Sequence, residues 1–163
     1  MKKYLWILSA LVLFAGHSCQ ETIDIEKENT AVLEKFNQWV YAIQDEDAEM
    51  LETLLCDDPD MIFFGTDALE RWIGKEEFIA AQEAFFEVSS ESKIEIYNTT
   101  NKLSTSGNVA WTSCMLNWDI VSGDQAMHLE GIRMTSVLEK RDGTWVIVQG
   151  HGSVPVSGQM IEY

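Results

Sequence analysis

Asp67 and His151 are the side chains of this 163-residue chain that are best suited to proton transfer. A carboxylate in apolar surroundings has a raised pKa, and a neutral imidazole exchanges protons near neutral pH, so each is a candidate general acid or base. Each also has a structural explanation. Asp67 follows Gly65 and Thr66 and can cap a turn. His151 lies between two glycines and can orient the last strand through a hydrogen bond. Regular alternation would place it on the same side of that strand as Trp145 and Ile147.

Arg133 is the candidate for binding a charged group. In a regular strand it shares a face with Leu129, Gly131, Thr135 and Val137, which are mostly small or apolar. A guanidinium in such surroundings can bind a carboxylate through two parallel hydrogen bonds. It can equally pair with one of the 27 acidic residues of the chain. We predict that Arg133 and Thr135 contact a ligand, with a structural ion pair as the alternative.

Tryptophan is frequent for a chain of this size, with six residues. Large rings can line a hollow that accepts a flat apolar ligand, although most rings of a small domain belong to its core. Trp39, Trp72 and Trp111 are predicted to line such a hollow. Trp111 and Trp118 differ by an odd number of positions, so an unbroken strand directs them to opposite faces. One of the two is then available for a subunit interface.

The sequence predicts no metal site and no cofactor. His128 and His151 are the only histidines after residue 18, and no cysteine or histidine pair has zinc-ligand spacing. No glycine cluster precedes a helix as in nucleotide-binding loops, and Ser153 has no helix after it, as a nucleophile elbow would require. Hydrolase and nucleotide-binding functions are therefore excluded. Cys56 and Cys114 could form a disulfide outside the cytoplasm, but nothing in the sequence brings them together.

The elements that must position these residues change type along the chain. Apolar residues recur every three or four positions in the first half and every second position in the second half. This predicts an α+β domain in which three N-terminal helices cover one face of a curved antiparallel sheet and leave a concavity. The helices are expected at 30–44, 47–55 and 75–88, with Asp47 as the cap of the second helix. The strands are expected at 61–64, 94–96, 109–120, 127–140 and 144–153.

The first nineteen residues have the layout of a secretory signal. Lys2 and Lys3 precede an apolar run that is too short for an ordinary membrane span, and the run is followed by small residues and then Cys19. This ending resembles a bacterial lipoprotein signal, with 1–18 removed and Cys19 lipidated. The alternative is an ordinary secreted protein that is cut nearby. Either way the expected location is the cell envelope, outside the cytoplasm, with residues 19–28 as an acidic tether.

The charge of the chain excludes several partners. The formal charge is −16, and the loss of Lys2 and Lys3 with the signal makes it −18. An anionic surface repels nucleic acid and anionic lipid headgroups. We therefore expect no nucleic-acid partner, and membrane attachment only through the lipid anchor, whose several chains would hold firmly.

Two stretches carry a family resemblance. The segment GIRMTSVLEKRDGTWVIV at 131–148, with HGS at 151–153, resembles the end of the SnoaL-like group in the nuclear transport factor 2-like superfamily, which shares the cystatin-like fold. FGTD at 64–67, ERW at 70–72 and GK at 74–75 are similar to the stretch between a strand and a helix in that group. The resemblance covers residues 29–157, leaves 158–163 as a tail, and implies a cone-shaped domain with a deep pocket, commonly dimeric through the outer sheet face.

The superfamily contains enzymes and inert domains, so the resemblance does not fix the function. The chain also resembles the association domain of calcium/calmodulin-dependent kinase, but Ser136 and Gly152 replace its arginines. Three hypotheses follow. The domain binds a small, largely apolar ligand with Arg133 and His151 as polar anchors. Alternatively it is an isomerase, dehydratase or cyclase that uses Asp67 or His151, or it is a dimeric interaction module with a filled cone.

Overall fold

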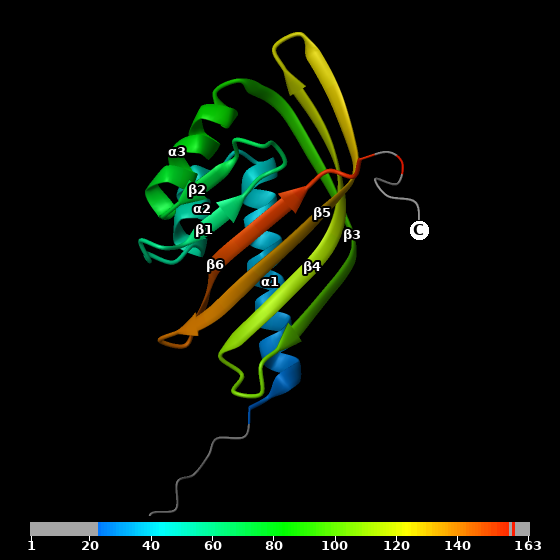
Figure 1. The fold of residues 1–163 in the computed structure, drawn as a ribbon. Coiled ribbons are helices and arrows are strands. Elements are labelled where there is room, and N and C mark those ends of the chain that lie inside the picture. Colours follow the sequence, from blue (N-terminus) through cyan, green and yellow to red (C-terminus); the bar gives the residue numbers. More distant parts are fainter. Residues whose placement is uncertain (1–22, 157, 159–163) are drawn as a thin grey trace, which may run out of the picture.

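The computed structural model describes residues 23–156 and 158 and has the expected α+β architecture (Figure 1). A bent six-stranded sheet carries the helices on one of its faces. The predicted signal, Cys19 and most of the predicted C-terminal tail lie outside the described residues. Within the described part of the chain, no helix is long and apolar enough to cross a membrane.

The first two of the three helices begin after an aspartate that caps the first turn. Helix α1 (Ile25–Gln44) begins after Asp24, whose side chain accepts a hydrogen bond from the Lys27 amide. Asp47 caps α2 (Ala48–Leu54) in the same way, as predicted. Helix α3 (Lys75–Phe86) follows Gly74. Because α1 starts five residues earlier than expected, the prediction of a tether up to residue 28 is wrong for residues 25–28.

Glu28 explains why the start of α1 is fixed. One of its carboxylate oxygens accepts a hydrogen bond from Lys140 Nζ at 2.5 Å and the other accepts one from Trp145 Nε1 at 2.9 Å. These bonds tie the first turns of α1 to the last two strands and lower the pKa of Glu28, chiefly through the bond from Lys140.

The strands form one sheet in the order β2-β1-β6-β5-β4-β3. Neighbouring strands are antiparallel except for the parallel pair of β1 and β6, which the sequence did not indicate. The short strand β2 was not predicted either. The strands are β1 (Ile62–Phe64), β2 (Arg71–Ile73), β3 (Ser89–Leu103), β4 (Val109–Ser122), β5 (Gln125–Arg141) and β6 (Thr144–Ser153).

Bulges bend the sheet and change which residues face the helices. In β5, two residues, Glu130 and Gly131, lie opposite the single residue Asn117 of β4. Gly131 has a φ of 71°, and its amide donates a hydrogen bond of 3.0 Å to Asn117 Oδ1. In β6 the register against β5 shifts between Ile147 and Gln149. Past each bulge the alternation of inward and outward residues is inverted.

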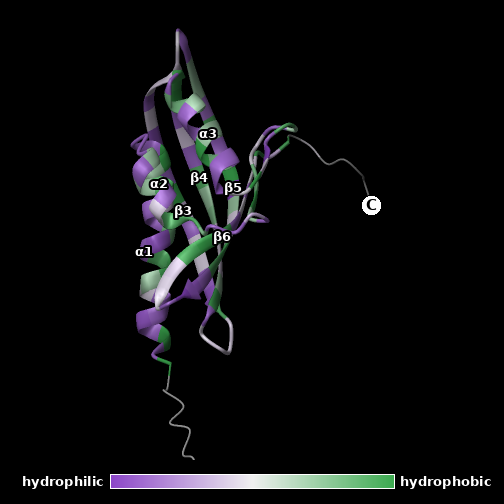
Figure 2. Cartoon of the chain, turned by 90° about the vertical axis from the view of Figure 1, so that its left-hand side faces the viewer, coloured by the Kyte–Doolittle hydropathy of each residue, from purple (hydrophilic) through white to green (hydrophobic). Residues whose placement is uncertain are grey.

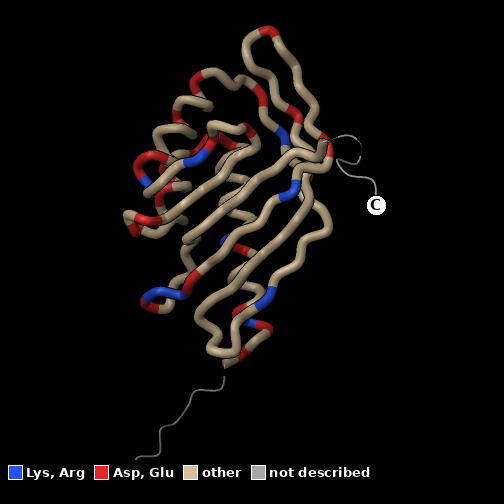
Figure 3. Tube along the Cα trace, in the orientation of Figure 1, with Lys and Arg blue, Asp and Glu red and all other residues tan. Residues whose placement is uncertain are grey.

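The core lies between the helices and the concave face of the sheet. Val32, Phe36, Trp39 and Val40 form its helical side, where hydrophilic and hydrophobic residues alternate along α1 (Figure 2). From the sheet, every second residue of β4 from Ala110 to Ile120 faces inward and all but the half-buried Trp118 are fully buried. Acidic residues lie mostly on helices and loops, whereas the strands in the foreground carry few charges (Figure 3).

Candidate functional site

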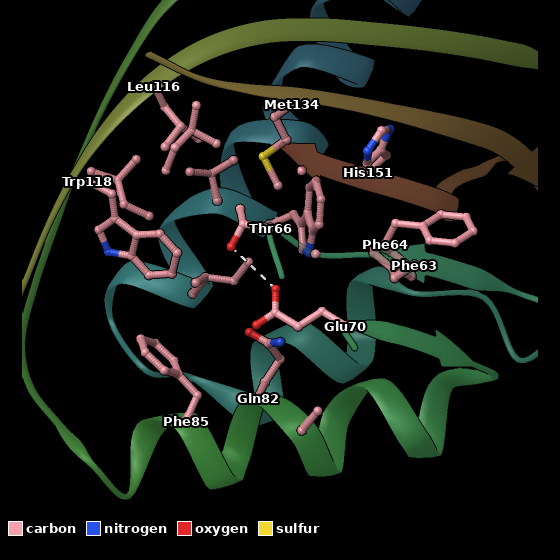
Figure 4. Close-up of a pocket in the computed structure, with 18 of the residues that line it drawn as sticks. Phe63, Phe64, Thr66, Glu70, Gln82, Phe85, Leu116, Trp118, Met134 and His151 are labelled. Carbon is pink, nitrogen blue, oxygen red and sulfur yellow. Dashed lines mark hydrogen bonds between the residues drawn. The ribbon is translucent and has the colours of Figure 1, made fainter. Parts of the chain in front are cut away.

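A cavity of about 280 Å³ lies between α1, α3 and the concave face of the sheet (Figure 4). Its apolar wall comes from α1 and from the neighbouring strands β4 and β5. The residues of this wall are Val40, Ile43, Leu116, Ile120, Ile132 and Met134.

Four aromatic rings form a continuous side of the cavity. Trp39 packs edge-on against Phe63 with 5.5 Å between the ring centroids, and Phe63 stacks on Phe78 at 4.2 Å. Trp72 then meets Phe78 edge-on at 5.6 Å. Gly150 permits this arrangement, because a Cβ atom there would lie 2.3 Å from Cε1 of Phe63. The side is therefore built by α1, β1, β2 and α3 together.

Another pair of rings closes the end of the cavity toward β3. Phe85 of α3 meets Trp118 of β4 edge-on at 5.5 Å, and Figure 4 shows both at this end. The indole N–H of Trp118 donates a hydrogen bond of 2.9 Å to Ser92 Oγ. Trp118 thus presents an apolar ring, with its polar atom already paired.

The polar end of the cavity is built around Glu70. Its Oε2 accepts hydrogen bonds from the Asp67 amide at 2.8 Å and from Thr66 Oγ1 at 3.3 Å. A Cβ atom at Gly65 would lie 2.2 Å from this oxygen, so the carboxylate can fold back over the chain only because residue 65 is glycine. In Figure 4, Glu70 and Gln82 of α3 point toward one another across this end. Within the described lining, Glu70 is the only carboxylate.

Asp67 does not line the cavity and takes the structural role. It is exposed, and its Oδ1 accepts a hydrogen bond of 3.1 Å from the Leu69 amide. Its own amide holds Glu70 in place. The structure thus favours Glu70 over Asp67 as the carboxylate of the cavity, and Asp67 shapes the turn that positions it.

His151 lies at the rim of the cavity with its ring edge-on to Phe64, the centroids being 5.9 Å apart. It pairs in register with Phe64 and with Thr135, which are both exposed, while Gly150 is buried. The expectation that it shares a face with Trp145 and Ile147 is therefore wrong, because the β6 bulge inverts the alternation. No carboxylate partner of His151 is present among the described residues, so it has no acid–base pair.

Arg133 and Thr135 lie on the outer, convex face of the sheet. Arg133 is exposed and donates a hydrogen bond of 3.1 Å to the Val154 carbonyl. The Gly131 bulge is the cause, because it directs Ile132 and Met134 inward and Arg133 outward. The predicted roles of Arg133 and Thr135 as cavity residues are contradicted by this placement.

The tryptophans lie on both faces of the sheet, and Trp111 and Trp118 face opposite ways, as the alternation of side chains along β4 requires. Trp39 and Trp72 line the cavity, as predicted, whereas Trp111 is 47% exposed on the outer face. Trp118 occupies the inward position instead. Trp39 is 2% exposed, and its indole N–H has no hydrogen-bond partner among the described residues.

The cysteines and the metal-binding residue types are not gathered into a site. Cys56 and Cys114 are free, buried thiols. Burial raises the pKa of both and brings that of Cys114 to about 11. Within the described chain, no three histidine, cysteine, aspartate or glutamate residues are close enough to hold a metal ion.

Sequence reasoning missed Glu70, Gln82, Trp118 and Met134. One signal was available, since an isolated glycine within a strand pattern, such as Gly131, often marks a bulge. A bulge at that residue predicts Met134 inward and Arg133 outward. Glu70 carries no comparable signal, because its place depends on the fold of the loop between β1 and β2.

The curved sheet with helices across its open side and a cavity inside defines the cone-shaped class of α+β domains. The chain belongs to the SnoaL-like domain family, whose model matches residues 32–157. No curated protein matches it. The match starts three residues after the predicted domain boundary at residue 29 and ends at the predicted one.

Solved structures show the same fold. A nuclear transport factor 2-like superfamily protein from Salmonella enterica serovar Typhimurium is similar with a TM-score of 0.74 and 19% identity, over 85% of this chain and 99% of that one. A protein with a cystatin-like fold from Caulobacter vibrioides has a TM-score of 0.67 and 18% identity, over 80% and 92%. A candidate scytalone dehydratase from Novosphingobium aromaticivorans has a TM-score of 0.70 and 13% identity, over 80% and 86%.

Proposed function

We propose that this protein is an extracytoplasmic SnoaL-like lipoprotein that binds a small, largely apolar organic ligand in its cavity. The observation that carries the proposal is the cavity itself, which has aromatic and aliphatic walls and one polar end formed by Thr66, Glu70 and Gln82. Binding sites for small molecules combine an apolar lining with a few convergent polar groups in this way. Lipidation of Cys19 supplies the proposed attachment to the membrane.

The cavity volume limits the size of the ligand. A cavity of about 150 Å³ lined by aliphatic and aromatic residues holds one benzene ring. At about 280 Å³, this cavity has room for roughly two fused rings. The flat shape of such a compound suits the aromatic side formed by Trp39, Phe63, Phe78 and Trp72.

Native mass spectrometry of the full chain, followed by extraction and identification of bound compounds, tests this proposal. Ala81→Trp places a large ring at a cavity-lining position of α3 and is expected to abolish retention of the compound. Ala80→Trp adds the same ring at the neighbouring exposed position and should retain it. Equal retention by both variants would contradict a ligand in this cavity.

A second candidate is an enzyme that transfers a proton within the cavity. The hydrogen bonds that Glu70 accepts from other described residues both involve Oε2, so Oε1 is left to act on a ligand. The test is exchange of the acidic C–H protons of tetralone, a bicyclic ketone, for deuterium in heavy water. Wild type should accelerate the exchange and Glu70→Gln should not. An equal rate with both proteins would refute this candidate.

The outer sheet face is the proposed homodimer surface. Trp111 is 47% exposed and Phe64 is 39% exposed on this face. Exposed aromatic rings are common at protein interfaces. Sedimentation should show a dimer for wild type and a monomer for Trp111→Glu. A wild-type monomer would remove the dimer from the proposal and leave ligand binding unaffected.

A further inference from the structure

One end of the domain exposes apolar side chains at the place where the chain leads back to Cys19. Ile23 is 39% exposed and Ile25 is 51% exposed. Ile23 lies against the turn between β3 and β4, because a Cβ atom at Gly107 of that turn would be 2.7 Å from its Cδ1. Glu28 ties the beginning of α1 to β5 and β6. The chain therefore leaves the domain at a fixed place, which we call the anchor end and define as Ile23, Ile25 and residues 104–108.

The anchor end differs in charge from the helical side of the domain. Residues 104–108 include no acidic or basic side chain. Next to them, the exposed acids Asp24 and Glu26 are accompanied by the exposed base Lys27. The helical side carries more carboxylates (Figure 3), and those exposed on α3 include Glu76, Glu77 and Glu83. An anionic membrane surface therefore repels the helical side more strongly than the anchor end.

The position of Cys19 limits how far the anchor end can lie from a membrane that holds this residue. Four peptide units join Cys19 to Ile23, and a chain of that length spans at most about 14 Å. The cavity lies much further along the domain. Trp39 is the first residue of α1 in its lining, and the helical rise places it about 20 Å from Ile25.

We propose that the anchor end rests on the membrane that holds the lipidated Cys19 and that the cavity lies in the half of the domain that points away from the bilayer. The exposed isoleucines enter the headgroup region, and the acidic helical side stays in water. The turn between β4 and β5 lies at the opposite end of the domain (Figure 1). A ligand then reaches the cavity from the aqueous compartment. This inference rests on the lipidation in the proposed function and adds the orientation.

Fluorescence quenching in vesicles tests the orientation. The full chain, produced with its lipid anchor, is placed in phosphatidylcholine and phosphatidylglycerol vesicles that carry a spin label on some headgroups. A fluorescent maleimide is attached through Thr105→Cys at the anchor end, Asp124→Cys in the β4–β5 turn or Glu83→Cys on α3. We expect strong quenching at position 105 and little at 124 and 83. Equal quenching at all three positions, or the strongest quenching at 124 or 83, would overturn the orientation.

Ile25→Glu isolates the contribution of the exposed isoleucines. The new carboxylate is repelled by the anionic headgroups, so the label at position 105 should lose much of its quenching. An acidic residue in the first turn of a helix is favourable, so α1 should still form. Val88→Glu is the matched control, because Val88 is 56% exposed and follows α3. Quenching that is unchanged by Ile25→Glu would overturn the role of the isoleucines.

Flotation of the vesicles separates a failure of the orientation from a failure of the proposed function. If the chain floats with the vesicles but is quenched most at 124 or 83, only this inference fails. If the chain does not float and mass spectrometry finds Cys19 unmodified, the proposed lipid attachment fails and this inference fails with it.

Discussion

Gly150→Ala tests whether the close approach of β6 to the aromatic side of the cavity is a requirement of the fold. The added Cβ atom would lie 2.3 Å and 2.5 Å from two carbons of Phe63 and 3.1 Å from Cη2 of Trp39. Carbon atoms in contact are normally about 3.5–4.0 Å apart. Both rings are buried, so neither can turn away into solvent. Phe63, Trp39 or the strand must therefore shift by about 1 Å.

The expected size of the effect follows from two opposing contributions. Overpacking of a core costs about 1–3 kcal/mol. Replacement of glycine by alanine at a compatible backbone conformation returns about 0.4–1 kcal/mol, because the unfolded chain has fewer conformations. The net loss is roughly 0.5–2 kcal/mol, which lowers the Tm by about 1–8 °C for a chain of this length.

Gly152→Ala is the matched control for this experiment. It changes the same residue type two positions along β6, on the same face, but its Cβ would lie at an ordinary 3.6 Å from Thr66. We expect Gly152→Ala to keep or slightly raise the Tm. Thermal unfolding followed by circular dichroism measures both variants. The packing explanation is refuted if Gly150→Ala melts like wild type or if both substitutions lower the Tm equally.

Three further predictions concern residues outside the cavity. Glu28→Gln should destabilise the chain at pH 7 by about 1.5–3 kcal/mol, the range of hydrogen bonds to a charged group. Because Lys140 and Trp145 lower the pKa of Glu28, this stabilisation is present above the unfolded-state pKa and lost as the pH falls through the folded-state pKa. Denaturant unfolding at pH 7 and below pH 4 should show the difference from wild type shrinking with acid, and a constant difference contradicts this. The buried Cys114 thiol, whose pKa is raised to about 11, should resist alkylation at pH 8 until denaturant is added. Peptide mass spectrometry measures the labelling. Rapid labelling of the native chain would show that the thiol is not buried. Arg133→Ala should leave the retention of bound compounds in native mass spectrometry unchanged, because Arg133 lies on the outer face of the sheet; a loss of retention would contradict this placement.

The helices and strands could be predicted because their signals are local. Asp47 followed by an apolar pattern predicted α2 and its cap, and the change of period near residue 90 predicted the long strands. The strand β2 could not be predicted in this way. Its three residues pair with β1 only because the loop that contains Glu70 folds back, and no periodicity is visible over three positions.

The candidate site was predicted less well because its residues depend on strand register. Trp39 and Trp72 were predicted to line the cavity and do so. Arg133 and His151 were expected to face inward from uninterrupted alternation, but a bulge lies before each of them in its strand. A single extra residue reverses every later side chain of a strand, so an error of one position exchanges the inner and outer faces.

The sequence by itself determined the order of the main elements and the acidic character of the chain, because composition and short-range periodicity are properties of the chain alone. The family was indicated separately, by the resemblance of the motifs at 64–75 and 131–153. Only the tertiary structure decided which polar groups meet in the cavity. Glu70 enters it through a turn built by Gly65 and Asp67, opposite Gln82 of α3. Both facts depend on contacts between segments that are distant in sequence or on the exact path of a loop, and such contacts exist only once the chain is packed.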